Sequence, residues 1–246
     1  MLKALHATDV RPIGWELWGR WVLVHVVAGI AGWSLSAAAA MFTCGAGILF
    51  AGLMVGIVLG GGQGLVLQPY MQSWSPSRFW LIRLVFLART ERILFWHGWL
   101  LCSVVGAVPG WWLSGLLISL MRRPFVVQPS MIWLLAFLLP GAIVGALQWV
   151  ILRRQSQHAI WWIAVNAIAW STGAAIGAYA GDGVYRAIAP ENIPYYFEGF
   201  WIKEAIQLAV SGSVGTMFAA FITGIGLVWL LRHPITPSPN LISPFS

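Results

Sequence analysis

Six apolar stretches dominate the sequence; they cover residues 21–40, 45–67, 94–120, 131–152, 160–179 and 205–231. A helix of about 20 residues crosses a hydrocarbon layer about 30 Å thick, and its backbone satisfies its own hydrogen bonds in lipid. Charged residues make up only 9% of the chain, against about 25% in a soluble domain. We therefore expect an all-α, polytopic membrane bundle of six transmembrane helices.

The chain divides into a cytoplasmic N-terminal segment (1–20), a transmembrane domain (21–232) and a flexible, proline-rich cytoplasmic tail (233–246). Of the 14 Lys and Arg residues, ten fall on the side of the two termini, and four fall on the other side: Arg122, Arg123, Arg186 and Lys203. The positive-inside rule then predicts that both termini lie in the cytoplasm, and we expect the membrane to be a bacterial inner membrane. Because the cations lie between apolar stretches, and not on one basic face, nucleic acid is not an expected partner.

Two connections show patterns of their own. Residues 79–89 are apolar with basic residues at intervals, which predicts an interfacial helix lying in the plane of the membrane. Residues 181–198 combine turn formers with aromatic residues, so we expect an exposed loop at the membrane surface. Tryptophans near the ends of the stretches, Trp21 and Trp99 among them, are expected to be interfacial anchors.

A degenerate pattern occurs three times along the chain. A small residue followed by tryptophan lies in the first, third and fifth stretches, at Trp33, Trp111 and Trp170. A run ending in leucines closes the second, fourth and sixth stretches, and in two of them it begins with Gln63 or Gln148. This order predicts three two-helix repeats. The three tryptophans are expected to pack beside small residues or, alternatively, to line a pocket for a pigment, a quinone or a lipid tail.

Glycines recur at helical spacing within the stretches. One face of a helix then becomes smooth enough for a neighbouring helix to approach closely. The glycines expected to pack in this way are Gly45, Gly52, Gly56, Gly60, Gly141, Gly145, Gly173 and Gly177.

Polar residues inside a membrane are the first candidates for a functional site. Here they are Gln63, Gln148, Asn166 and His25. The amides are expected to bridge helices or, alternatively, to contact a substrate. His25 is a candidate pigment ligand, although a lone membrane histidine more often bonds a neighbouring carbonyl. No motif indicates a catalytic residue or a metal site, and the sequence requires no cofactor, so we do not expect an enzyme.

Residues 141–153 have a Gly-x-x-x-Gly-x-x-Gln-x-x-x-Leu-Arg pattern. In this the chain resembles uncharacterised multi-pass proteins of cyanobacteria and filamentous phototrophic bacteria. That resemblance implies a fold and no activity. Six short-looped spans are also similar to the substrate-binding components of energy-coupling-factor transporters, and three two-helix units are similar to the mitochondrial carrier plan, whose proline signature is absent here.

Smooth glycine faces and few intramembrane charges favour a non-catalytic accessory or structural subunit of a larger membrane complex. If the resemblance to proteins of phototrophs holds, this complex is photosynthetic or transfers electrons. Its partners would be the lipid bilayer and other membrane subunits, with possible lipid, pigment or quinone contacts. The alternative is a transporter or binding protein for an uncharged or lipid-like small molecule, with a pocket near mid-membrane lined by Asn166 and Trp170.

Overall fold

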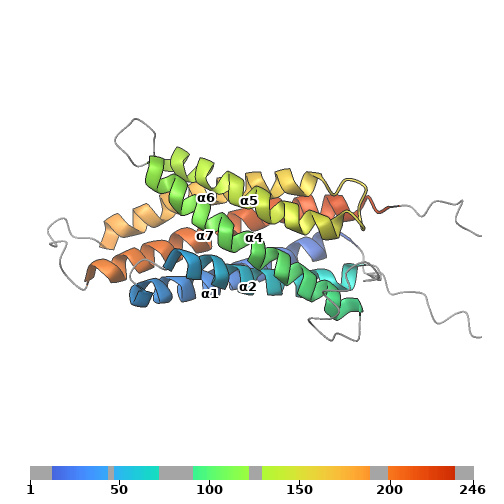
Figure 1. Ribbon diagram of the computed structural model, residues 1–246, viewed down its shortest axis with the longest axis horizontal. Helices are drawn as coiled ribbons and strands as arrows, with labels where there is room; N and C mark the ends of the chain where they lie inside the picture. The colour runs from blue at the N-terminus through green and yellow to red at the C-terminus, as the bar shows by residue number, and fades with distance from the viewer. Residues whose placement is uncertain (1–12, 44–46, 72–90, 122–128, 189–198, 236–246) are drawn as a thin grey trace, which may run out of the picture.

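A computed structural model of the protein describes residues 13–43, 47–71, 91–121, 129–188 and 199–235. The long helices run side by side along one axis (Figure 1), and there are six of them in the described residues. They are α1 (Trp15–Thr43), α2 (Gly47–Leu67), α4 (Glu91–Met121), α5 (Pro129–Leu152), α6 (Trp161–Ile188) and α7 (Gly199–Leu231), with a short 3₁₀ helix η1 (Gln68–Tyr70) after α2. Each long helix is long and apolar enough to cross a membrane. The predicted all-α, six-helix fold is confirmed, and it indicates a multi-pass integral membrane protein.

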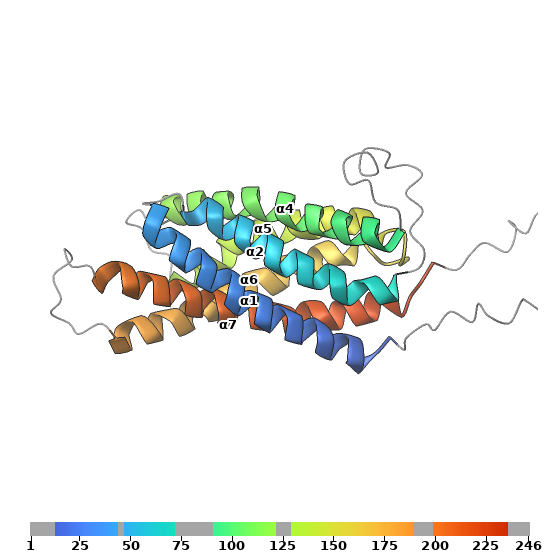
Figure 2. The same cartoon turned by 90° about the horizontal axis from the view of Figure 1, so that it is seen from below.

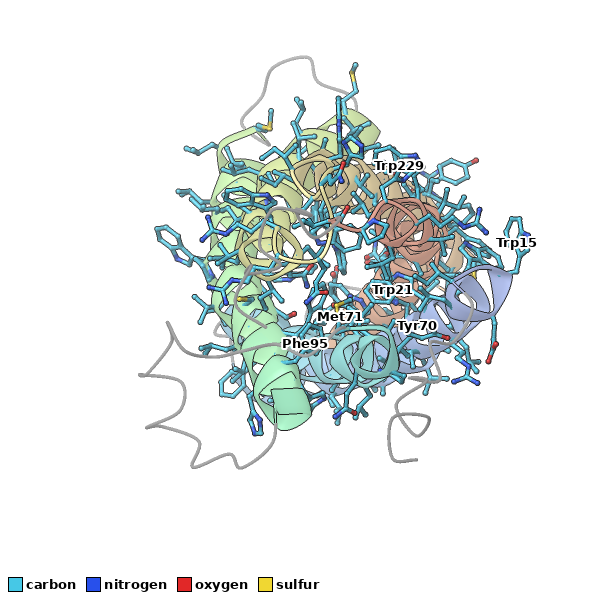
Figure 3. The ribbon with its side chains drawn as sticks, turned by 90° about the vertical axis from the view of Figure 1, so that its right-hand side faces the viewer. Trp15, Trp21, Tyr70, Met71, Phe95 and Trp229 are labelled. Carbon is cyan, nitrogen blue, oxygen red and sulfur yellow. The ribbon has the colours of Figure 1, made fainter. Side chains whose placement is uncertain are left out.

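The six helices form a closed ring. Each helix packs against its two neighbours in chain order, and α7 returns to pack against α1. Figure 2, a side view, shows α1, α2 and α7 on one side of the ring. Figure 3 looks along the bundle and shows the ring itself. Because helices on opposite sides of the ring do not pack directly in the described part of the chain, the space along the axis is left to side chains and cavities.

The ends of α2, α5 and α7 coincide with the ends of the predicted stretches, but the predicted loop from residue 181 is wrong at its start. Helix α6 continues to Ile188. Gly181 is buried against α7, where a Cβ would overlap the Ser211 hydroxyl. One turn further on, Arg186 forms an ion pair with Asp182 at i,i+4, a spacing that stabilises a helix.

Proline inside a helix frees a carbonyl that another helix can use. Pro140 in α5 has no N–H, so the carbonyl of Ala136 receives no bond from it. The hydroxyl of Ser114 in α4 donates to this carbonyl at 2.9 Å. The proline is therefore accommodated by a bond between helices, as membrane helices require.

One end of the ring is tightly closed. Trp21, Trp99 and Trp162 have no exposed surface and pack with Leu67, Leu152 and Leu227 in one apolar cluster. Trp21 points into the ring, whereas Trp15, six residues earlier, points away from it (Figure 3). The prediction that Trp21 and Trp99 are interfacial anchors is wrong, because their indole N–H groups have hydrogen-bond partners inside the ring.

Candidate functional site

A hydrogen-bond network crosses the axis next to the closed end. Its centre is the amide pair of Gln63 in α2 and Gln148 in α5, joined by a bond of 3.2 Å from Gln148 Nε2 to Gln63 Oε1. Gln63 Oε1 also accepts the indole N–H of Trp99 at 3.0 Å, and Gln148 Oε1 accepts that of Trp162 at 2.9 Å. Gln148 Nε2 donates further to the Ser103 hydroxyl at 3.1 Å. Both amides are almost fully buried, so these bonds replace solvent.

His25 joins the network from α1. Its Nδ1 lies 2.8 Å from the carbonyl of Trp21, which can only accept, so Nδ1 carries the proton. Nε2 is then an acceptor for the Gln63 amide, 2.8 Å away. Both ring nitrogens are occupied within the protein. In this arrangement His25 has no lone pair free for a pigment metal.

The three buried tryptophans repeat one arrangement around the ring. Each donates its indole N–H to a side chain on the neighbouring helix that comes before its own in the ring. Trp99 of α4 donates to Gln63 of α2, Trp162 of α6 donates to Gln148 of α5, and Trp21 of α1 donates to Thr223 of α7 at 3.0 Å. A polar side chain follows each tryptophan by four residues and lies within hydrogen-bond distance of its carbonyl, at His25, Ser103 and Asn166. All six helices thus contribute to this polar layer.

The predicted packing glycines lie at helix contacts. A Cβ at Gly52, Gly56 or Gly60 would meet α4; one at Gly141 or Gly145 would meet α6; and one at Gly173 or Gly177 would meet α7. Gly45 lies outside the described residues, as do the predicted interfacial helix at 79–89 and the tail from residue 236.

Beyond the polar layer lies a small cavity of about 40 Å³. Gln63, Ser103 and Gln148 line it on the polar side, and Trp111, Phe137 and Trp170 line it on the other. It has room for only a few water molecules.

A much larger cavity of about 540 Å³ begins behind these same three rings. The cavity lies at the end of the ring opposite the buried tryptophan cluster. There it is enclosed by the C-terminal halves of α1, α4 and α6 and by the N-terminal halves of α5 and α7. Small-molecule sites in proteins have volumes of about 300–1,000 Å³. The cavity is therefore large enough for an organic ligand.

Five aromatic side chains line the inner part of this cavity: Trp33, Trp111, Trp133, Phe137 and Trp170. The Trp111 ring centre lies 4.7 Å from those of both Trp33 and Phe137, in edge-to-face contacts. Trp33 is fixed further by donating its indole N–H to Thr216 at 2.9 Å, and its ring covers Gly212, where a Cβ would overlap it. These contacts position Trp33, Trp111 and Phe137 within the protein itself.

Polar and charged side chains line the outer part. On α6 they are Tyr179, Asp182 and Arg186, and on α7 they are Glu204, Gln207 and Ser211. Asp182 and Arg186 pair with each other at 2.6 Å. The side chains of Glu204, Gln207 and Ser211 have no hydrogen bond or ion pair within the described residues. A rigid apolar interior with unpaired polar groups at its mouth is typical of a binding site for an amphipathic molecule.

The predicted site residues therefore separate into two groups. His25, Gln63 and Gln148 come together in the polar layer, with Asn166 on its edge, bonded to the Trp162 carbonyl at 3.0 Å. Trp33, Trp111 and Trp170 line the large cavity. Sequence reasoning did not single out Trp162, Ser103 and Thr223, although the four-residue spacing from tryptophan to a polar residue was a usable signal for Ser103.

Among the described residues, no three His, Cys, Asp or Glu side chains gather in a way that could hold a metal ion. No family model matches the chain, and neither a curated protein nor a solved structure is significantly similar to it.

Proposed function

We propose that this protein is an integral membrane binding protein or carrier for a small amphipathic organic molecule, which it holds in the aromatic cavity. The observation that supports this most directly is the combination of a volume of about 540 Å³, a rigid aromatic interior and unpaired polar side chains at one end. A ligand with a flat apolar body and a polar group would place the body among the rings and the polar group at the mouth.

The polar layer has a structural part in this proposal. It closes the axis on the far side of the cavity with hydrogen-bonded amides and buried tryptophans, so a bound molecule has access from one side only. If both termini are cytoplasmic, as the basic residues predict, the mouth faces the opposite side of the membrane. Access from one side at a time is what a carrier requires. The accessory-subunit role stays a prediction from the sequence.

The test is to fill the cavity. The protein is extracted in mild detergent, and the small molecules that co-purify are identified and quantified by mass spectrometry. Ala174 lines the cavity on α6, so Ala174→Trp should abolish retention of the molecule. Ile176 lies on the same helix with 40% of its surface exposed, which makes Ile176→Trp the matched control. A molecule retained equally by both variants, or no stoichiometric molecule in the unaltered protein, would contradict the proposal.

A further inference from the structure

The charges at the cavity mouth indicate the chemical class of the ligand. Resting on the function proposed above, we infer that the molecule is an organic cation: an ammonium or similar positive group attached to an apolar ring or chain. The alternative drawn from the sequence was a protein that binds an uncharged or lipid-like molecule, but the cavity extends to three charged side chains on the last turns of α6 and the first turns of α7.

The three charges do not cancel. Asp182 and Arg186 neutralise each other at 2.6 Å, which leaves the carboxylate of Glu204 on the facing helix without an ion-pair partner among the described residues. Lys203 precedes Glu204 in α7 but does not line the cavity. The described side chains that line the mouth therefore carry one net negative charge. An anionic ligand would have to displace Asp182 from Arg186, whereas a cation meets an unpaired carboxylate.

The interior of the cavity favours the same sign of charge. The faces of indole rings are negative, and a cation within about 6 Å of a ring centre is attracted to them. Trp33, Trp111, Trp133 and Trp170 provide four such rings, all within one site. An inorganic cation is a poor fit, since it would need several oxygen ligands and the inner part of the cavity offers mostly carbon.

Two probes of the same shape separate charge from size. Phenyltrimethylammonium and tert-butylbenzene differ only by nitrogen or carbon at the centre of the bulky group, and therefore by one positive charge. Binding of each is measured by equilibrium dialysis against the protein in lipid nanodiscs. Ala174→Trp protein, measured in parallel, gives the partitioning into lipid that must be subtracted. We expect the cation to bind at least tenfold more tightly than the neutral probe.

Charge variants at the mouth provide the second part of the test. Glu204→Gln should weaken cation binding about fivefold, the effect of one partly screened charge. Arg186→Gln leaves Asp182 unpaired and should strengthen it by a similar factor. Neither variant should change the affinity for the neutral probe. Glu16→Gln is the control, because Glu16 lies at the other end of the bundle, paired with Arg20 at 2.6 Å.

The outcomes distinguish this inference from the proposed function. If both probes bind equally above the Ala174→Trp background, and Glu204→Gln has no effect, the cavity binds ligands but the cation assignment is overturned. A neutral or anionic co-purifying molecule lost in Ala174→Trp also overturns it. If neither probe binds and nothing co-purifies, the proposed function fails as well. Tighter cation binding that responds in opposite directions to Glu204→Gln and Arg186→Gln supports both.

Discussion

Gln148 offers the sharpest test of the polar layer. Its side chain is 1% exposed and makes three hydrogen bonds, to Gln63, Ser103 and Trp162. Gln148→Leu keeps nearly the same volume but removes all three. Hydrogen bonds between membrane helices contribute about 0.6 kcal/mol each on average, so the three contribute about 2 kcal/mol.

The partners of Gln148 are affected unequally. Gln63 Oε1 keeps the Trp99 indole, and the Ser103 hydroxyl keeps the Trp99 carbonyl. The Trp162 indole N–H, which is fully buried, loses the one acceptor that it has among the described residues, and this costs about 1 kcal/mol or more. Gln148→Leu should therefore lower the free energy of unfolding by about 3 kcal/mol.

The assay is reversible unfolding in mixed micelles of mild detergent and dodecyl sulfate, followed by circular dichroism. Thr172→Val is the control, since within the described residues the Thr172 hydroxyl bonds only carbonyls of its own helix. Adding Trp162→Phe to Gln148→Leu removes the N–H that was left without an acceptor. The free energy of unfolding of the double variant should therefore be about 1 kcal/mol higher than the sum of the two single-variant effects predicts. If Gln148→Leu and the control differ by less than about 0.5 kcal/mol, the network does not bear on stability as argued.

Two further predictions follow from the packing and from the cavity. Gly177→Ala would place a Cβ 2.9 Å from the backbone nitrogen of Gly215, so α6 and α7 must separate, and we expect a loss of about 2 kcal/mol in the same unfolding assay. Gly183→Ala, on the same helix with nothing within 4 Å, should be neutral or stabilising, and equal effects of the two would refute the close packing. For the cavity, a cysteine replacing Ser211 in a variant free of native cysteines should react with a membrane-impermeant thiol reagent, whereas one replacing Ser103 in the polar layer should not. Equal reaction at both positions would show that the axis is open throughout.

The helices could be predicted from the sequence because hydropathy is a local property of the chain. The ends of α2, α5 and α7 at Leu67, Leu152 and Leu231 were placed correctly for this reason. The extension of α6 to Ile188 was not, since Gly181 and Gly183 are typical of turns when considered alone. What makes the segment helical is its contact with α7 and the Asp182–Arg186 pair, and neither is visible in local composition.

The site was harder to predict than the fold. These helices are apolar on all sides, so the sequence does not show which face is turned to the axis. Trp99 and Trp112 lie on the same helix, yet Trp99 is fully buried and Trp112 is 55% exposed. The pairing of Gln63 with Gln148 depends on the closure of the ring, which places two amides 85 residues apart at the same depth. The charged mouth was missed because Asp182 and Arg186 were assigned to a loop.

The position of the cavity can be traced to one difference between the helices. When α1, α4 and α6 are aligned on Trp21, Trp99 and Trp162, Trp33 and Trp111 each follow twelve residues later, and α6 has Ala174 at that point. Trp170 lies one turn earlier and lines both cavities. The threefold repeat stays a prediction, but this comparison gives a physical reason for the space: α6 lacks the ring that its counterparts insert there. Ala174→Trp would supply that ring, and this is why we expect it to fill the cavity without disturbing the packing of the six helices.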